Sequence, residues 1–309
     1  MTPPNKTTLW QIHDDRPGHH NQLRGLTSAL TELLSLDVHT LRAPSPRSSL
    51  AALWSKRFPL DSGLPAPDLI LGAGHATHLA VLAARRAYGG LAIVLMKPSL
   101  PSALFDLCLI PEHDQVSESE KVVTTRGVLN IVRPTQQHNR RSGLLLIGGP
   151  SAAHDWSNEQ MLEQITTITS SNPSIQWRLT NSRRTPPSFL EHLAKKKIAN
   201  LQVTLHQDTH SAWVPEQLAQ AAQVWVSEDS VSMVYEALTS GAAVGVLDVP
   251  SRRHGRVAAG VDTLTESGWA TRFADWQPGV WLAPPPAQLN EARRCAEIVC
   301  RRLRSRSAA

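Results

Sequence analysis

The chain has 309 residues and a mass of 33.8 kDa, which predicts about two domains and excludes a peptide hormone or a single small module. Hydrophobic residues make up 41% and charged residues 18%, a balance typical of a folded globular protein. The net charge of +5 predicts anionic partners such as nucleotide phosphates, nucleic acid or an acidic membrane face. Much of this charge lies in residues 290–309, which contain six arginines and two glutamates.

Targeting signals and cysteine usage indicate the compartment. No stretch approaches the roughly 18 uninterrupted apolar residues of a membrane-spanning helix, and residues 1–15 lack the apolar core of a secretory signal. Cys108, Cys295 and Cys300 are too scattered for a disulfide framework, and no CxxC pair offers a zinc site. We therefore expect a cytoplasmic protein, either free or peripheral at the inner face of the membrane.

In the first half of the chain, short apolar runs alternate with stretches of helical periodicity. The pattern predicts helices over residues 19–34 and 75–88, and it leaves residues 42–61 as a loop or a loosely helical insertion. The predicted strands of this half cover residues 8–13, 37–41, 68–73, 92–96 and 107–110.

The second half repeats the alternation. Its predicted strands cover residues 144–147, 175–180, 202–205, 223–226 and 243–247, and its predicted helices cover residues 158–168, 188–197, 212–221 and 230–239. Repeated strand–helix units with nearly continuous apolar strands predict an α/β protein whose parallel sheets are covered by helices on both faces.

A polar, arginine-containing stretch at residues 132–142 is the best candidate for a domain boundary. We expect Rossmann-like domains over residues 1–135 and 142–285, followed by a basic amphipathic helix and tail over residues 286–309. Ligands are expected at the carboxyl ends of the strands, facing a cleft between the two domains.

The first predicted strand leads into a polar turn that contains Asp14, Gly18 and His19. A glycine lets the backbone approach a ligand, and the free amides of a helix start favour an anion or a sugar oxygen. His19 is a candidate general base for an alcohol or amine, because an imidazole titrates near neutral pH. Helix capping by Asp14 or Asp15, with His19 as half-buried packing, is an equally good interpretation.

The third predicted strand ends in a degenerate GxGxxG motif at residues 72–77. Lys97 stands about 20 residues further on in place of an acid, which disfavours dinucleotide binding. His75 and His78 have the i, i+3 spacing of two metal ligands, but no third ligand is marked and we expect no metal. Gly74 is expected to line the cleft, and Lys97 either meets a ligand anion or is a solvated loop lysine.

Two adjacent arginines, Arg183 and Arg184, follow Ser182 after a strand in the second half. Guanidinium groups pair well with phosphate oxygens, and the amides of the following helix start add donors, so this turn suits a diphosphate. The alternative is a basic turn that faces solvent.

The segment of residues 226–237 is the richest in polar groups. Three serines surround a predicted helix start and a glutamate follows about two turns into the helix: Ser227, Ser230, Ser232 and Glu236. Hydroxyls and amides in this arrangement can hold a nucleotide diphosphate and its ribose, although simple capping by Asp229 or Ser230 explains part of the pattern. Glu228 and Asp229 oppose a phosphate site unless their charges point away from it.

Six ordered motifs between about Trp10 and Trp269 resemble the plant "elongated mitochondria" fission family, whose bacterial relatives are catalogued as candidate glycosyltransferases. The motifs are DRPGHHNQ at 15–22, GAGHAT at 72–77, MKP at 96–98, IGGP at 147–150, NSRRTP at 181–186 and SEDSVSM at 227–233.

The resemblance implies a GT-B-like fold, with the nucleotide-sugar donor on the C-terminal domain and the acceptor toward the N-terminal one. By similarity to GT-B enzymes such as the cell-wall glycosyltransferase that makes lipid II, it implies His19 and Asp14 as catalytic residues. The implied donor-binding residues are Gly149, Ser182, Arg183, Arg184, Ser227, Ser230, Ser232 and Glu236. The acceptor-side residues are Arg16, Gly18, Asn21, Gly74, His75 and Lys97.

We therefore expect a metal-independent glycosyltransferase that uses a nucleotide-diphosphate sugar as its donor and needs no cofactor. The sequence has no Asp-x-Asp motif, which agrees with a leaving diphosphate stabilised by a helix dipole and arginines. The acceptor is expected in the cell envelope or on a lipid, and the C-terminal arginines would either rest on an anionic membrane or form a solvated tail. A non-catalytic adaptor of the fission type and a sugar-nucleotide epimerase are the alternatives. No nucleic-acid partner is expected, since the nine tryptophans are dispersed.

Overall fold

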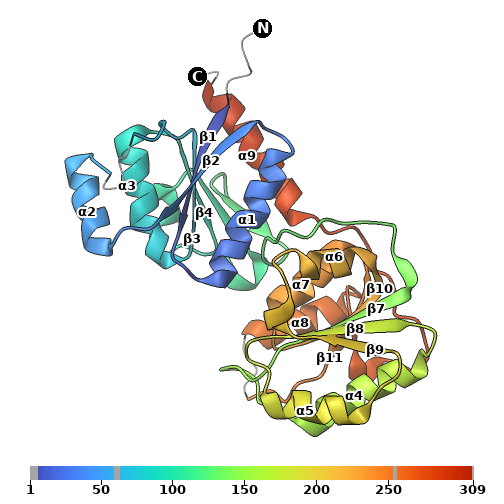
Figure 1. Cartoon of the computed structure of the whole chain (residues 1–309). Coiled ribbons are helices and arrows are strands. Elements are labelled where there is room, and N and C mark those ends of the chain that lie inside the picture. The colour runs from blue at the N-terminus through green and yellow to red at the C-terminus, as the bar shows by residue number, and fades with distance from the viewer. Residues whose placement is uncertain (1–5, 59–62, 253–255, 308–309) are drawn as a thin grey trace. The chain divides into compact units, whose positions relative to one another are not determined.

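The computed structural model describes residues 6–58, 63–252 and 256–307. The chain forms two compact units (Figure 1). Unit 1 comprises residues 1–131 and 291–309, and unit 2 comprises residues 132–290. Each unit is built on a six-stranded parallel sheet with helices on both faces, which confirms the expected doubly wound α/β architecture.

The sheet of unit 1 has the strand order β2-β1-β3-β4-β5-β6. Its strands are β1 (Thr7–His13), β2 (Leu36–Arg42), β3 (Leu69–Ala73), β4 (Leu91–Leu95), β5 (Leu107–Pro111) and β6 (Val122–Thr125). The chain winds outward from β1 to β2 on one side and from β3 to β6 on the other, so the topological switch point lies between β1 and β3. Ligands in open parallel sheets bind at the carboxyl ends of the strands at such a point.

Helices cover both faces of this sheet because successive apolar side chains along each strand point to opposite faces. Leu9 and Leu71 pack under α1 (Pro17–Thr31) and α9 (Glu291–Ser307), whereas Trp10 and Ile70 pack under α2 (Pro46–Ser55) and α3 (His78–Tyr88). Figure 1 shows these two pairs of helices on opposite faces of the sheet. Short 3-10 helices occupy His75–Thr77, Ser102–Leu104 and Glu112–Asp114.

Three elements of unit 1 differ from the sequence prediction or are left open by it. Strand β6 is absent from the predicted strands. The insertion predicted over residues 42–61 contains a ten-residue helix, α2, whose start is capped by the Ser45 side chain accepting from the Ser48 amide at 3.2 Å. The C-terminal helix, which the sequence analysis treats as a segment of its own, belongs to unit 1. Its stripe of Cys295, Ala296 and Val299 is buried against α1 and the sheet.

The sheet of unit 2 has the order β12-β11-β10-β7-β8-β9, with its switch point between β7 and β10. Its strands are β7 (Asn139–Ile147), β8 (Gln176–Asn181), β9 (Leu201–Thr204), β10 (Ala221–Ser227), β11 (Ala243–Leu247) and β12 (Thr271–Arg272). Strand β7 begins inside the stretch that the sequence analysis assigns to the boundary, and β12 is absent from the predicted strands.

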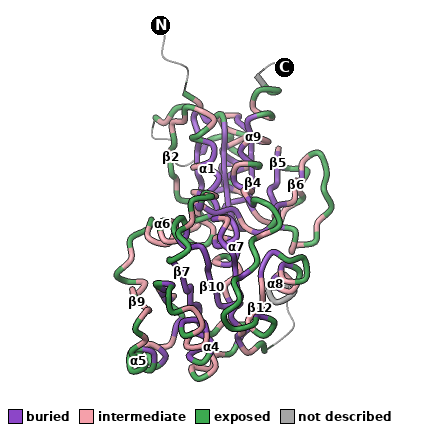
Figure 2. The backbone as a smooth tube through the Cα atoms, turned by 90° about the vertical axis from the view of Figure 1, so that its right-hand side faces the viewer, coloured by how far each residue is buried: buried purple, intermediate pink, exposed green. Residues whose placement is uncertain are grey.

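The helices of unit 2 again form two layers. One face carries α4 (Asn158–Ser171) and α5 (Pro187–Lys196), and the other carries α6 (Trp213–Gln220), α7 (Val231–Ser240) and α8 (Arg256–Glu266). Short 3-10 helices occupy His206–Asp208 and Phe273–Asp275. Figure 2 shows that β7 and β10, the two strands at the switch point, are buried over most of their length.

Two glycine–tryptophan pairs fix the packing under α4 and α5. Gly143 on β7 is opposite Trp177 on β8, and Gly245 on β11 is opposite Trp225 on β10. A Cβ atom on either glycine would collide with the facing indole ring, so each tryptophan lies flat over a strand position that only glycine can fill. Among the described residues, no helix has both the length and the apolar character that crossing a bilayer requires.

Candidate functional site

A histidine–aspartate pair lies at the switch point of unit 1. The Nδ1 atom of His19 is 2.9 Å from both carboxylate oxygens of Asp14. Asp14 follows β1, His19 is in the first turn of α1, and both side chains are mostly buried, with 6% and 13% exposed. Because the carboxylate can only accept hydrogen bonds, Nδ1 carries the hydrogen and Nε2 of the neutral ring keeps its lone pair. A histidine held in this way can accept a proton from a ligand at Nε2.

Gly74, at the carboxyl end of β3, closes one side of this pair. Its φ of 82° is in the left-handed region, and a Cβ atom there would collide with the His19 ring. The residue is therefore glycine for two reasons, its backbone conformation and the close approach of the imidazole.

The start of α1 presents open backbone donors beside the pair. Pro17 has no N–H, and the first helical hydrogen bond runs from the His20 amide to the Arg16 carbonyl, so the amides of Gly18 and His19 lack an acceptor within the helix. No acidic residue lies in this first turn, and the space around Gly18 is open. A ligand oxygen can therefore approach these amides directly.

The other residues predicted for the acceptor side lie around the same edge of the sheet. Arg16 and Asn21 are exposed at the start of α1, and His75 is exposed after β3. Lys97 is exposed after β4 and donates to the Asp114 carbonyl at 3.3 Å.

His78 is buried instead, with its Nδ1 atom 3.1 Å from Ser99 Oγ. Burial, with smaller contributions from His75 and His19, lowers the pKa of His78 from 6.5 to about 4. Its ring is therefore neutral near pH 7. Within the described residues, no group of three or more His, Cys, Asp or Glu side chains is placed to hold a metal ion.

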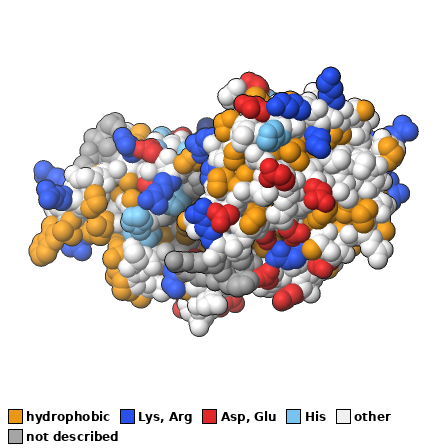
Figure 3. Space-filling view, turned by 90° about the horizontal axis from the view of Figure 1, so that it is seen from below, with side chains coloured by type: hydrophobic (Ala, Val, Ile, Leu, Met, Phe, Trp, Pro, Cys, Tyr) orange, Lys and Arg blue, Asp and Glu red, His pale blue; other side chains and the backbone are white. Residues whose placement is uncertain are grey.

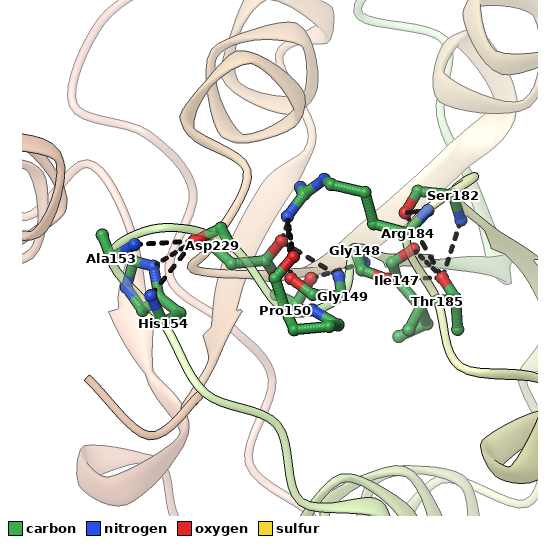
Figure 4. A network of polar contacts seen from close by, with 12 residues as sticks. Ile147, Gly148, Gly149, Pro150, Ala153, His154, Ser182, Arg184, Thr185 and Asp229 are labelled. Carbon is green, nitrogen blue, oxygen red and sulfur yellow. Dashed lines mark hydrogen bonds and ion pairs between the residues drawn. The ribbon is translucent and has the colours of Figure 1, made fainter. Parts of the chain in front are cut away.

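In unit 2, an arginine–aspartate ion pair lies at the switch point (Figure 4). Arg184 reaches from the loop after β8 to Asp229 after β10, with 2.7 Å between Nη2 and Oδ2. The other terminal nitrogen of Arg184 donates to the carbonyls of Gly149 and Pro150 at 2.7 and 3.1 Å. The Asp229 side chain is fully buried and also accepts from the Gly149 amide at 3.0 Å.

The loop after β7 is fixed from both neighbouring strands. The Ser227 hydroxyl accepts from the Gly148 amide at 2.7 Å, and the Thr185 hydroxyl donates to the carbonyls of Ile147 and Gly148. A Cβ atom on Gly149 would meet the backbone of Arg184. These groups are occupied in building the loop, so Gly149, Arg184 and Ser227 hold its shape.

The exposed part of this site is the start of α7 and the turn before α5. Ser230 is the N-cap residue of α7 but makes no side-chain capping bond, and the first turn of the helix contains no acid. Ser232 and Arg183 are exposed, and no ion pair of Arg183 is found within the described part of the chain. Ser182 is half-buried, and its hydroxyl accepts from the Arg184 amide at 3.1 Å. Hydroxyls, open amides and a free guanidinium are groups that bind phosphate.

The two carboxylates before α7 are neutralised by arginines. Asp229 pairs with Arg184, and Glu228 accepts from Arg272 at 2.9 Å and from the Val249 amide at 3.0 Å. The negative charges next to the start of α7 are therefore paired inside unit 2. They would therefore repel a phosphate bound at the start of α7 only weakly.

Glu236 lies in the second turn of α7 and is half-buried. Burial raises the pKa of its carboxyl group from 4.5 to about 7. A carboxyl group that titrates near neutral pH can accept hydrogen bonds from sugar hydroxyls when it is charged.

Comparison with known proteins places the chain in a family. Residues 17–303 match the family described as Mitochondrial fission ELM1. The protein belongs to this family. This ELM1-family protein is also 22% identical to the uncharacterised protein RP120 of Rickettsia prowazekii. The alignment covers 94% of this chain and 97% of the relative.

Solved structures share the GT-B fold of this ELM1-family protein. MurG of Acinetobacter baumannii aligns with a TM-score of 0.55 at 13% identity and covers 96% of this chain and 99% of its own. The UDP-GlcNAc 2-epimerase of Methanocaldococcus jannaschii has a TM-score of 0.58 at 13% identity, covering 96% and 100%. The Neisseria meningitidis UDP-GlcNAc 2-epimerase bound to UDP-GlcNAc has a TM-score of 0.51 at 12% identity, also covering 96% and 100%.

The segments selected from the sequence of the ELM1-family chain lie at the carboxyl edges of the two sheets, but the sequence analysis missed some of the contacts made there. It treated Asp229 as a cap or a repelling charge, whereas Asp229 is the buried centre of the loop network. It did not select Thr185, which donates to the Ile147 carbonyl. The only sequence feature that could have indicated this residue is its position in the NSRRTP motif, two residues after Arg183. The donor-binding and catalytic roles of the selected residues remain predictions.

Proposed function

We propose that the protein transfers a sugar from a nucleotide-diphosphate donor to an acceptor hydroxyl, without a metal ion. One observation carries the proposal: each unit presents an uncapped helix start at the switch point of its parallel sheet. Helix α1 begins beside the His19–Asp14 pair, and α7 begins with the half-buried Ser230 and the exposed Ser232. Support also comes from the fold, because the Neisseria enzyme that shares it is bound to UDP-GlcNAc.

Unit 2 binds the donor in this proposal. The diphosphate accepts hydrogen bonds from the open amides at the start of α7 and from Ser230 and Ser232, and Arg183 supplies a cation. Glu236 accepts from the ribose hydroxyls. Ser182 contributes a further hydroxyl, while Arg184, Ser227 and Gly149 keep the loop after β7 in shape for the ligand.

Unit 1 activates the acceptor. The acceptor hydroxyl loses its proton to Nε2 of His19 as its oxygen bonds to the anomeric carbon of the sugar. The bond from that carbon to the diphosphate oxygen breaks, and its electron pair leaves with the nucleotide diphosphate. Asp14 stabilises the imidazolium that forms, and the amides of Gly18 and His19 orient the acceptor.

The donor site is tested by isothermal titration of the full-length protein with UDP and GDP. We expect binding of one of the two nucleotides and at least tenfold weaker binding by Arg183→Ala, because a charge-assisted phosphate contact contributes about 1.5–3 kcal/mol. Lys195→Ala, which removes a cation from the far end of α5, is the matched control. Folded protein that binds neither nucleotide at millimolar concentration contradicts the proposal.

The epimerase alternative is favoured by the likeness to UDP-GlcNAc 2-epimerases, and it predicts interconversion of sugar nucleotides without any acceptor. A non-catalytic adaptor of the fission type predicts nucleotide binding without turnover, or none at all. Product analysis with a panel of sugar nucleotides separates the three. Transfer or slow donor hydrolysis that is lost in His19→Ala supports the glycosyltransferase.

A further inference from the structure

Among the described residues of unit 1, the two most exposed large apolar side chains lie together on α2. Trp54 is 84% exposed and Leu50 is 51% exposed. They are four residues apart on a helix, so they project from the same face one turn apart. The opposite face of α2 is buried through Ser49 and Ala52 against the core under α3. The outward face of α2 thus has an apolar ridge that takes no part in the core.

Positive charge surrounds this ridge. Arg47, Lys56 and Arg57 are exposed at the two ends of α2, and residues 43–58 contain no aspartate or glutamate. Figure 3 shows the same pattern at the left-hand edge of the molecule, where hydrophobic side chains are bordered by lysine and arginine side chains. Figure 1 places α2 at this edge. We define Arg47, Leu50, Trp54, Lys56 and Arg57 as the α2 ridge.

We propose that the α2 ridge docks on the surface of an anionic phospholipid membrane. Tryptophan and leucine on a basic helix are suited to the boundary between headgroups and acyl chains, where the indole ring buries its apolar body and keeps its N–H hydrated. The flanking cations attract the negative surface of the leaflet. The complementarity of charge selects a membrane over a neutral protein surface as the occupant.

The C-terminal helix does not offer the same combination. Its apolar stripe, with Cys295, Ala296 and Val299, is buried in the core of unit 1, so α9 has no apolar face left to insert into lipid. It contributes only charge, through the exposed Arg301, Arg304 and Arg306. The expected membrane contact through the C-terminal arginines is therefore electrostatic at most, and the α2 ridge carries the apolar part.

Helix α2 begins on the same side of unit 1 as the edge of the sheet that carries the His19–Asp14 pair. Helix α2 follows β2, whose carboxyl end is at the same edge of the sheet as the His19–Asp14 pair at the end of β1. Docking through α2 would hold this edge of unit 1 near the membrane. Such an arrangement suits a lipid-linked acceptor. This choice of substrate class rests on the proposed function, whereas the docking itself does not.

The test is co-sedimentation of the full-length protein with vesicles, with no nucleotide present. We expect binding to vesicles of equal parts phosphatidylglycerol and phosphatidylcholine and little binding to phosphatidylcholine alone. The double variant Leu50→Ser/Trp54→Ser should bind about tenfold more weakly, since it removes the inserted apolar area. Leu104→Ser/Val280→Ser, which removes two other exposed apolar side chains, is the matched control and should bind like the wild type.

Charge variants distinguish docking through α2 from a general attraction of a basic protein. Arg47→Gln/Lys56→Gln/Arg57→Gln and Arg301→Gln/Arg304→Gln/Arg306→Gln each remove three positive charges, but only the first should weaken binding strongly. Equal losses, or full binding by Leu50→Ser/Trp54→Ser, overturn the proposal. A dimer that the same double variant converts to a monomer in analytical ultracentrifugation also overturns it, because the ridge is then a contact between copies. Quenching of Trp54 fluorescence by lipids with brominated acyl chains, lost in Trp54→Phe, gives an independent readout.

Discussion

The His19 ring is fixed on two sides, by the Asp14 carboxylate at 2.9 Å and by Gly74, where any larger residue would collide with the imidazole. Asp14 and Gly74 follow β1 and β3, the two strands that flank the switch point, and His19 is in the first turn of α1. An imidazole held this tightly loses little orientational freedom when it accepts a proton, which is a requirement of an efficient general base.

Replacement of His19 tests the proposed base. We expect His19→Asn to lower donor turnover by about 10²- to 10⁴-fold, the range that positioned proton transfer contributes. Asp14→Asn keeps the base but weakens its orientation and the stabilisation of its charge, so the loss should be smaller. Steady-state kinetics measure both.

The matched control for the base is His113→Asn, because His113 follows β5 at the same edge of the sheet and is not among the predicted site residues. It should retain activity. Equal activity of His19→Asn and His113→Asn, with both proteins folded by circular dichroism, would remove His19 from the mechanism.

Two glycines at the same site predict opposite behaviour. Gly18→Ala meets no atom within 4 Å and should keep or raise the melting temperature, since alanine favours a helix by up to about 1 kcal/mol. Its KM should nevertheless rise, because the added methyl group obstructs the ligand at the open amides. Gly74→Ala should lower stability by about 1–3 kcal/mol through its positive φ and its collision with His19. Thermal melts and KM values together separate the two. An unchanged KM in Gly18→Ala argues against a ligand at the start of α1.

The alternation of strands and helices could be predicted from the sequence because it depends on local periodicity. The buried strands read as continuous apolar runs, and the turns after them contain the polar motifs. Helix α2 was harder to predict because it is short and its periodic face is exposed rather than buried, with Trp54 and Leu50 in solvent. The place of α9 in unit 1 depends on contacts with α1 more than 250 residues earlier in the chain, about which local patterns carry no information.

The candidate site shows the same division between local and distant information. The sequence identified Arg183 and Arg184 together but could not distinguish their roles. Only the structure shows that Arg184 is bonded to Asp229, 45 residues away, while Arg183 is exposed. Likewise, the glycines opposite Trp177 and Trp225 are explained by register across strands, which a single sequence does not specify.

The two arginines therefore give a direct test of structure against binding. Arg184→Ala leaves the fully buried Asp229 without its cation and should destabilise the protein by about 1–3 kcal/mol. This is less than the loss expected on breaking a fully buried ion pair, because the arginine side chain is 40% exposed. Arg183→Ala should leave the unfolding free energy within about 0.5 kcal/mol of the wild type and affect nucleotide affinity alone. Urea denaturation measures the first effect and titration calorimetry the second. Similar losses of stability in both variants would contradict the assignment of roles.

The raised pKa of Glu236 predicts an unusual pH dependence of stability. The folded protein holds this proton up to about pH 7, whereas the unfolded chain releases it near pH 4.5. Between these values the folded state binds more protons, so the contribution of Glu236 to the unfolding free energy falls as the pH rises and is constant above about pH 7. Because the side chain is only half-buried, we expect a change of about 1–2 kcal/mol.

Glu236→Gln removes this titration, so urea denaturation at several pH values should show a flatter curve between pH 5 and pH 7 and greater stability than the wild type above pH 7. Nucleotide binding should change in the opposite sense, because only the charged carboxylate is a full acceptor for the ribose hydroxyls. The affinity of the wild type for UDP, relative to that of Glu236→Gln, should rise as the pH passes 7. The variant is the control because ionisation of the nucleotide itself affects both proteins equally. If the two proteins show parallel affinity curves, Glu236 does not contact the ribose, and the place of the nucleotide on α7 must be revised.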